Sequence, residues 1–138
     1  MDVVTDILIL DNNEEFVKKV KEKLKKHKNI RLVTSIEDGT YALETICQHK
    51  PDIVLMDLIL PKLKERNISS QLAQRGMKEM PAFVVASEFL NDKILLKAAA
   101  LGIDLFMFKP MDCDMLGQRI YSLSTFLPTI TDIAASYL

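Results

Sequence analysis

Polar side chains that could act together on a phosphoryl group follow four of the short apolar runs in this sequence. Asp11 and Asn12 follow the first run, Asp57 the third, Ser87 the fourth and Lys109 the fifth. Two carboxylates and an amide oxygen near one point suit Mg2+, which keeps several waters and accepts one or two carboxylates. An ammonium and a hydroxyl beside that metal could hold a phosphoryl group, because such transfer depends mainly on positioning and charge neutralisation. In this arrangement Asp57 is the predicted nucleophile.

Five short apolar runs supply the elements that must bring these side chains together. The runs cover residues 7–10, 30–33, 53–56, 83–86 and 105–108, and segments of helical period separate them. Near-continuous apolar runs are typical of strands buried on both faces of a parallel sheet, whose neighbouring strands need crossover connections. Since right-handed crossovers place helices on both faces, we predict a doubly wound α/β fold. Ligands of such sheets bind at the carboxyl ends of the strands, where the polar residues fall.

Apolar stripes at helical spacing predict the helices. The first stripe leaves the lysines between residues 18 and 28 on the opposite, solvated face. For the stripe that begins at Ile94, Asn91 suits the N-cap and Gly102 the position after the helix. The stripes consist of Phe16, Val17, Val20 and Leu24; Ala42, Leu43, Ile46 and Cys47; Ile94, Leu95, Ala98 and Leu101; and Leu116, Ile120 and Leu123.

Length and composition are those of one globular domain. The 138 residues are 49% hydrophobic and 27% charged, with a formal net charge of -1, which points to no particular partner. Cys47 and Cys113 lie far apart without CxxC or Cys/His spacing, and we expect reduced thiols. No apolar run approaches the roughly 18 residues of a membrane span, and the start of the chain lacks a basic n-region. We therefore expect a cytoplasmic protein with no membrane partner.

The ordered set of polar positions resembles the receiver domains of bacterial two-component response regulators. The matching segments are LILDNNEEF, DIVLMDLILP, VVAS and MFKP, within residues 6–124. The resemblance implies a flavodoxin-like (CheY-like) fold with five parallel strands in the order 2-1-3-4-5. It also implies that a histidine kinase or histidine phosphotransferase donates a phosphoryl group to Asp57. Such a domain signals to an output domain or partner protein and is not an enzyme beyond its own phosphorylation and dephosphorylation.

The same resemblance assigns roles to the residues at the strand ends. The implied Mg2+ ligands are Asp11, Asn12, Asp57 and the backbone carbonyl of Ile59. The implied phosphoryl contacts are Ser87 and Lys109, and Phe106 is the aromatic that turns inward on activation. From the residues alone, Phe106 is equally well interpreted as core packing, and Asp11 and Asp57 as helix-capping or loop acids.

The end of the chain suggests a second unit. Pro128 ends the last helical pattern, and apolar residues then recur at helical spacing at Ile130, Ile133, Ala134, Tyr137 and Leu138. So short a helix is marginal alone, so we expect it to dock or to support a homodimer. We therefore predict a receiver domain at residues 1–127 and an extension at 128–138 that begins a linker or output domain. The stretch 11–13 and this extension most resemble the sporulation-initiation regulators, whose receiver precedes a DNA-binding domain.

Three positions depart from the family pattern. Asn12 stands where the family usually has a second acidic Mg2+ ligand, so we expect weaker Mg2+ binding. Glu88 follows Ser87 where a small residue is usual, and Lys64-Glu65 replaces the usual Asp-Gly or Asn-Gly after the third strand. These departures favour an alternative function, a degenerate pseudo-receiver that acts as a phosphorylation-independent interaction module.

Other functions fit the sequence less well. The lysines of residues 18–28 lie opposite an apolar stripe without interleaved aromatics, so we expect no direct nucleic-acid binding by this domain. His27 and His49 lack the partner spacing of a metal site. The four glycines match neither GxGxxG nor a P-loop, which disfavours a flavin or nucleotide enzyme.

Overall fold

Five parallel strands form the sheet, in the predicted order β2-β1-β3-β4-β5. The computed structural model describes residues 4–60, 62–63, 68–88 and 91–109. Strands and helices alternate along this part of the chain, which confirms the doubly wound α/β fold. The elements are β1 (Thr5–Leu10), α1 (Glu14–Leu24), β2 (Ile30–Ile36), α2 (Ala42–His49), β3 (Ile53–Met56), α3 (Ile68–Gln74), β4 (Ala82–Ser87), α4 (Asp92–Leu101) and β5 (Leu105–Phe108).

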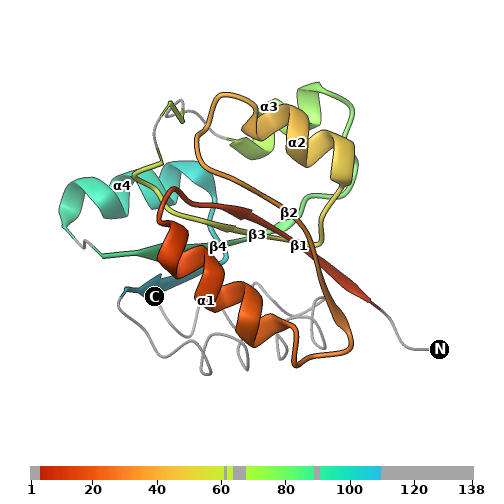
Figure 1. Cartoon of the computed structure of the whole chain (residues 1–138). Helices are drawn as coiled ribbons and strands as arrows, with labels where there is room; N and C mark the ends of the chain where they lie inside the picture. Colours follow the sequence, from red (N-terminus) through yellow and green to blue (C-terminus); the bar gives the residue numbers. More distant parts are fainter. Residues whose placement is uncertain (1–3, 61, 64–67, 89–90, 110–138) are drawn as a thin grey trace.

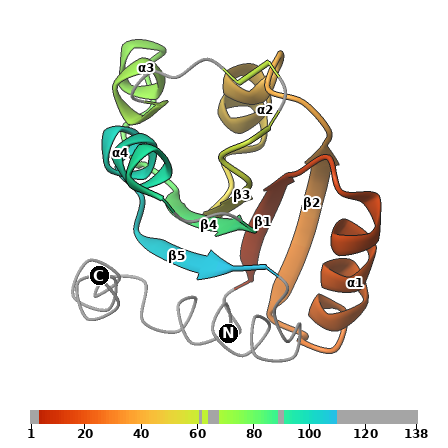
Figure 2. The ribbon, with the colours of Figure 1, turned by 90° about the vertical axis from the view of Figure 1, so that its left-hand side faces the viewer.

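Helices cover both faces of the sheet. Helix α1 lies against one face, and α2, α3 and α4 lie on the other (Figures 1 and 2). Side chains of β1 alternate between the two layers: Ile7 and Ile9 pack with α1, whereas Leu8 and Leu10 pack with α2, α3 and α4. All four are fully buried, so the central strands are apolar on both faces as the continuous runs predict.

Two elements differ from the sequence prediction. Strand β2 continues to Ile36, three residues beyond the apolar run, because Thr34 and Ser35 lie on a half-buried edge strand where polar residues are tolerated. Its register against β1 shifts between Ile7 and Leu8. Helix α3 has no apolar stripe in the sequence, since only Ile68 and Leu72 of its seven residues are buried apolar residues.

The helix ends follow local capping rules. Asn91 caps α4 as predicted, its side chain accepting a hydrogen bond from the Ile94 N–H at 2.9 Å, and Gly102 ends α4 at a φ of 70°. Helix α1 is capped by Asn13, not by Asp11, and the Asn13 side chain accepts from the Phe16 N–H at 3.0 Å. This cap fixes where α1 starts relative to the end of β1.

Several predicted features lie outside the described residues. They are the stripe at Leu116, Ile120 and Leu123, Lys64-Glu65, Cys113 and the extension at 128–138. Cys47 is a free thiol. In the described part of the chain, no helix has the length and apolar character needed to cross a membrane.

Candidate functional site

Backbone hydrogen bonds continue the sheet one residue past β3 and β5 and so place the candidate site residues. The Asp57 N–H donates to the Leu10 carbonyl at 2.9 Å, directly beside the position of Asp11. On the other side of β4, the Lys109 N–H donates to the Ser87 carbonyl at 2.8 Å. The carboxyl ends of β1, β3, β4 and β5 therefore present their polar residues at one edge, as in other open α/β sheets.

Lys109 joins the two aspartates. Its Nζ atom lies 2.6 Å from Oδ2 of Asp11 and 3.0 Å from Oδ2 of Asp57. The side chains are largely removed from solvent, with exposed fractions of 4% for Lys109, 2% for Asp11 and 14% for Asp57. One ammonium thus bridges two carboxylates that the sequence places on different strands.

The remaining carboxylate oxygens are held by the backbone. Oδ1 of Asp11 accepts from the Asn13 N–H, and Oδ1 of Asp57 accepts from the Ile59 N–H, both at 2.9 Å. Each bond closes a local turn two residues long, of the type that aspartate favours. Both carboxylates are therefore oriented from one side by the backbone and from the other by Lys109.

Burial and charge act in opposite directions on Asp11. Removal of the carboxyl from water raises the pKa of Asp11 above its ordinary value, and hydrogen bonds from Lys109 and from the Asn13 backbone offset part of that rise. With both aspartates ionised and Lys109 protonated, these three side chains carry a net charge of one negative unit. A further cation is favoured at such a place.

The other predicted site residues differ in exposure, and all except Phe106 lie at or just beyond the ends of the strands. Ser87 is fully buried at the end of β4. Asn12 and Glu88 are exposed, and the Ile59 side chain is 47% exposed beside its backbone contact with Asp57. Phe106 is half-buried on β5 and packs against the cluster shared by α2, α3 and α4.

One residue of this site is not among the predicted site residues. The Phe16 ring lies against Lys109, with 4.2 Å between its centroid and Nζ. In the sequence, Phe16 fits the apolar stripe of α1, and in the structure it also belongs to that core cluster. Its position in the first turn of the helix that follows Asp11 was the available signal.

The donor atoms suit a magnesium ion. Oδ2 of Asp11 and Oδ2 of Asp57 both accept hydrogen bonds from the Lys109 ammonium, so the two carboxylates lie close enough to share one positive charge. The described residues contain no group of three or more His, Cys, Asp and Glu side chains able to hold a metal. Two carboxylates with backbone, amide and water oxygens are nevertheless a usual set for Mg2+, which is seldom held by protein ligands alone.

Comparisons with known proteins agree with this fold. Residues 7–121 match the response regulator receiver domain family. A signal receiver domain of a response regulator from Bermanella marisrubri is 27% identical, with a TM-score of 0.69 over 88% of this chain and 98% of that chain. The signal receiver domain of NarL from Mycobacterium tuberculosis has a TM-score of 0.75 at 19% identity, over 89% of this chain and 98% of that chain. A DNA-binding response regulator of the LuxR family from Staphylococcus aureus has a TM-score of 0.73 at 15% identity, over 87% of this chain and 98% of that chain. From the family match and this fold, the chain belongs to the receiver domains of two-component response regulators.

Proposed function

We propose that Asp57 accepts a phosphoryl group from the phosphohistidine of a histidine kinase or histidine phosphotransferase. The observation that carries this proposal is the convergence of Asp11, Asp57 and Lys109 at the carboxyl edge of the sheet. As a receiver domain, the chain is a signalling module and not a classical enzyme. The phosphorylated state is its proposed signal.

The proposed transfer uses Asp57 as the nucleophile. A bond forms between an Asp57 carboxylate oxygen and phosphorus while the P–N bond of the phosphohistidine breaks, and the electron pair returns to the imidazole. Lys109 already contacts Asp57 at 3.0 Å and is placed to neutralise charge on the phosphoryl oxygens. The Ser87 hydroxyl, at the end of the adjacent strand, is the proposed second phosphoryl contact.

Asp11, Asp57, the Ile59 carbonyl and Asn12 are the proposed holders of Mg2+. When bound, the ion neutralises charge on the transferring phosphoryl oxygens. Asn12 contributes an amide oxygen, a weaker ligand than the carboxylate usual there, so we infer weakened Mg2+ binding.

Signal output is proposed to pass through Phe106 and an attached or separate partner. Phe106 is half-buried on β5 against the layer that contains α4, so a change of its rotamer would alter that surface. A DNA-binding output, as in the similar LuxR-family regulator from Staphylococcus aureus, is the output we propose. We also propose that the chain is the receiver of a regulator of the sporulation-initiation type. A homodimer supported by residues 128–138 is part of this proposal.

The second candidate function is a phosphorylation-independent interaction module. The observation that favours it is the direct ion pairing of both Asp11 and Asp57 with Lys109. Within the described residues, no buried side-chain nitrogen or oxygen lacks a hydrogen-bond partner. A site so satisfied is stable without phosphate or metal.

One experiment separates the two candidates. The chain is incubated with Mg2+ and acetyl phosphate, a small acyl phosphate donor, and its intact mass is measured. We expect the mass of one phosphoryl group to be added, and Asp57→Asn to abolish the addition. Asp38→Asn is the matched control, because Asp38 follows β2 and accepts from the Thr40 N–H at 2.8 Å in a similar turn. An unchanged mass in the unaltered chain would favour the interaction module.

A further inference from the structure

We propose that Phe16 is a positioning residue whose aromatic ring holds the Lys109 ammonium between Asp11 and Asp57. This inference deepens the phosphoacceptor function proposed above and rests on it for its consequence in phosphoryl transfer. The ring centroid lies 4.2 Å from Nζ of Lys109, well within the roughly 6 Å range of a cation–π contact.

The contact is shielded from water, which strengthens it. Phe16 is 9% exposed and the Lys109 side chain 4% exposed. Cation–π attraction is larger between desolvated groups than at an exposed surface. An ammonium taken out of water needs such compensation, because burial of a charge without partners is strongly unfavourable.

Asp11, Asn13, Phe16 and Lys109 form a closed cycle of contacts. The Asn13 N–H donates to Oδ1 of Asp11 at 2.9 Å, and the Asn13 side chain accepts from the Phe16 N–H at 3.0 Å. The Phe16 ring contacts Lys109, and Lys109 donates to Oδ2 of Asp11 at 2.6 Å. The start of α1 is therefore tied to the aspartate that it follows, and this tie sets the place of the ring.

An aromatic ring suits this position better than a third carboxylate or an aliphatic side chain. A lysine ammonium has three N–H donors, and here two of them serve Asp11 and Asp57. The ring attracts the cation through its quadrupole but brings no net charge. The charge of Lys109 thus stays available to a phosphoryl group on Asp57, whereas another carboxylate would compete for it.

The competing explanation is that Phe16 only fills the core. It packs in one cluster with Val17, Val20 and Leu24 of α1 and with sheet residues. For that role, hydrophobic volume matters and the electron density of the ring does not. Substitutions that withdraw electron density at nearly constant shape separate the two roles.

The test replaces Phe16 with 4-fluoro-, 3,5-difluoro- and 3,4,5-trifluorophenylalanine in the full chain, beside Phe16→Leu. The first readout is hydrogen exchange of the Lys109 ammonium, followed by 15N NMR without phosphate or metal. The second is the rate of phosphorylation by acetyl phosphate with Mg2+. We expect exchange to rise and phosphorylation to slow stepwise with each fluorine, by about tenfold for Phe16→Leu, which corresponds to about 1.4 kcal/mol.

Phe83→Leu is the matched control, because Phe83 is a buried aromatic of the opposite core cluster. It should lower stability without changing exchange at Lys109. Exchange that does not change with fluorination would overturn the positioning role, even if Phe16→Leu is too unstable to study. Graded exchange with an unchanged phosphorylation rate would overturn the role in transfer. Graded exchange in a chain that never accepts a phosphoryl group would overturn the proposed function but retain the hold of the ring on Lys109.

Discussion

Nζ of Lys109 lies 2.6 Å from Oδ2 of Asp11, although the two residues are 98 positions apart in the chain. Both side chains are almost fully buried, so the ion pair is compensated within the protein and not by water. Removal of one partner from such a pair leaves an unpaired buried charge, which is strongly destabilising. The contact therefore links the proposed phosphoacceptor site to the stability of the fold.

Lys109→Met should lower the free energy of unfolding by about 3 kcal/mol. The substitution leaves Asp11 and Asp57 close together without a counter-charge. Adding Asp11→Asn to Lys109→Met should recover part of the loss, which urea denaturation of the single and double variants measures. Lys19→Met is the control, since Lys19 pairs with Glu15 at 3.8 Å on the exposed face of α1 and should cost about 0.5 kcal/mol or less. Equal losses in Lys109→Met and Lys19→Met would contradict a buried ion pair.

Asn12→Asp should tighten Mg2+ binding several-fold. A carboxylate is a stronger ligand for this ion than an amide oxygen. The expected decrease in the dissociation constant is less than tenfold, which corresponds to about 1 kcal/mol. Calorimetric titration of both chains with MgCl2 gives the two dissociation constants. Asp11→Asn should weaken binding in the same assay. Identical affinities for the unaltered chain and Asn12→Asp would place Asn12 outside the metal site.

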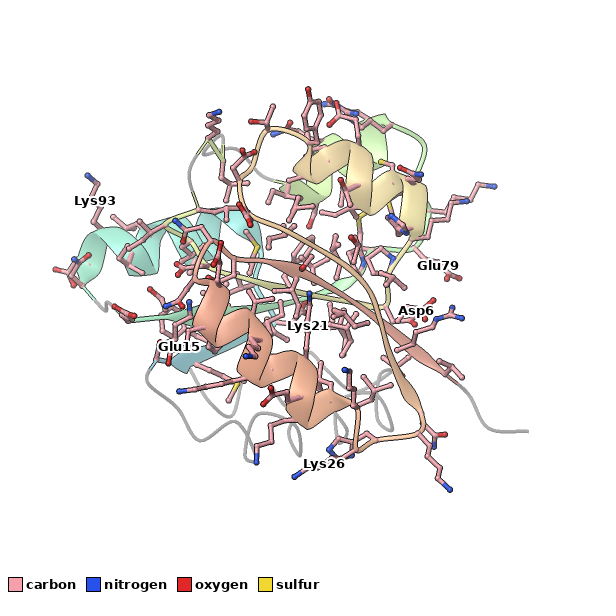
Figure 3. All side chains as sticks on the ribbon, in the orientation of Figure 1. Asp6, Glu15, Lys21, Lys26, Glu79 and Lys93 are labelled. Carbon is pink, nitrogen blue, oxygen red and sulfur yellow. The ribbon has the colours of Figure 1, made fainter. Side chains whose placement is uncertain are left out.

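Glu88→Ala should speed phosphorylation by acetyl phosphate at low salt. Glu88 is exposed and directly follows Ser87, so its charge repels an anionic donor that approaches this edge. The gain should shrink as salt is added, because screening weakens the interaction of exposed charges. Glu79→Ala is the control, because Glu79 is also exposed but lies far from the candidate site. Figure 3 shows Glu79 beside Asp6, at the opposite end of the molecule from Glu15, which lies in the first turn of α1. The same rate for Glu88→Ala and the unaltered chain would show that Glu88 points away from the site.

Asp104→Asn should change how stability depends on pH. Burial raises the pKa of Asp104, although its carboxylate accepts a hydrogen bond from the Phe83 N–H at 2.7 Å. The folded protein therefore binds this proton more tightly than the unfolded chain, and the resulting stability is complete below the unfolded pKa and lost as pH rises through the folded pKa. Asparagine keeps an acceptor for Phe83 without the buried charge. The stability of Asp104→Asn minus that of the unaltered chain should therefore be larger at neutral pH than near pH 3.8. Denaturant midpoints of both chains across this pH range measure this difference. A constant difference at all pH values would contradict the raised pKa.

The sequence alone determined the sheet and the edge that carries the candidate site. Strand length, apolar continuity and helical stripes are local properties, and each can be recognised in a short window. In a parallel sheet all carboxyl ends meet at one edge, so residues that follow the runs, such as Asp57 and Lys109, had to converge. The Asn91 cap and the Gly102 end of α4 were equally local, and both are confirmed.

Only the tertiary structure decided which atoms meet at that edge. The pairing of Lys109 with both Asp11 and Asp57, and the ring of Phe16 beside it, join segments whose relative depth depends on packing across the sheet. The extension of β2 through polar residues and the short α3 leave no periodic pattern in the sequence, because edge position and burial stabilise them. A side chain such as Phe16 looks the same in a stripe whether it faces only the core or also a buried ammonium. That difference is made by the neighbours which the fold supplies.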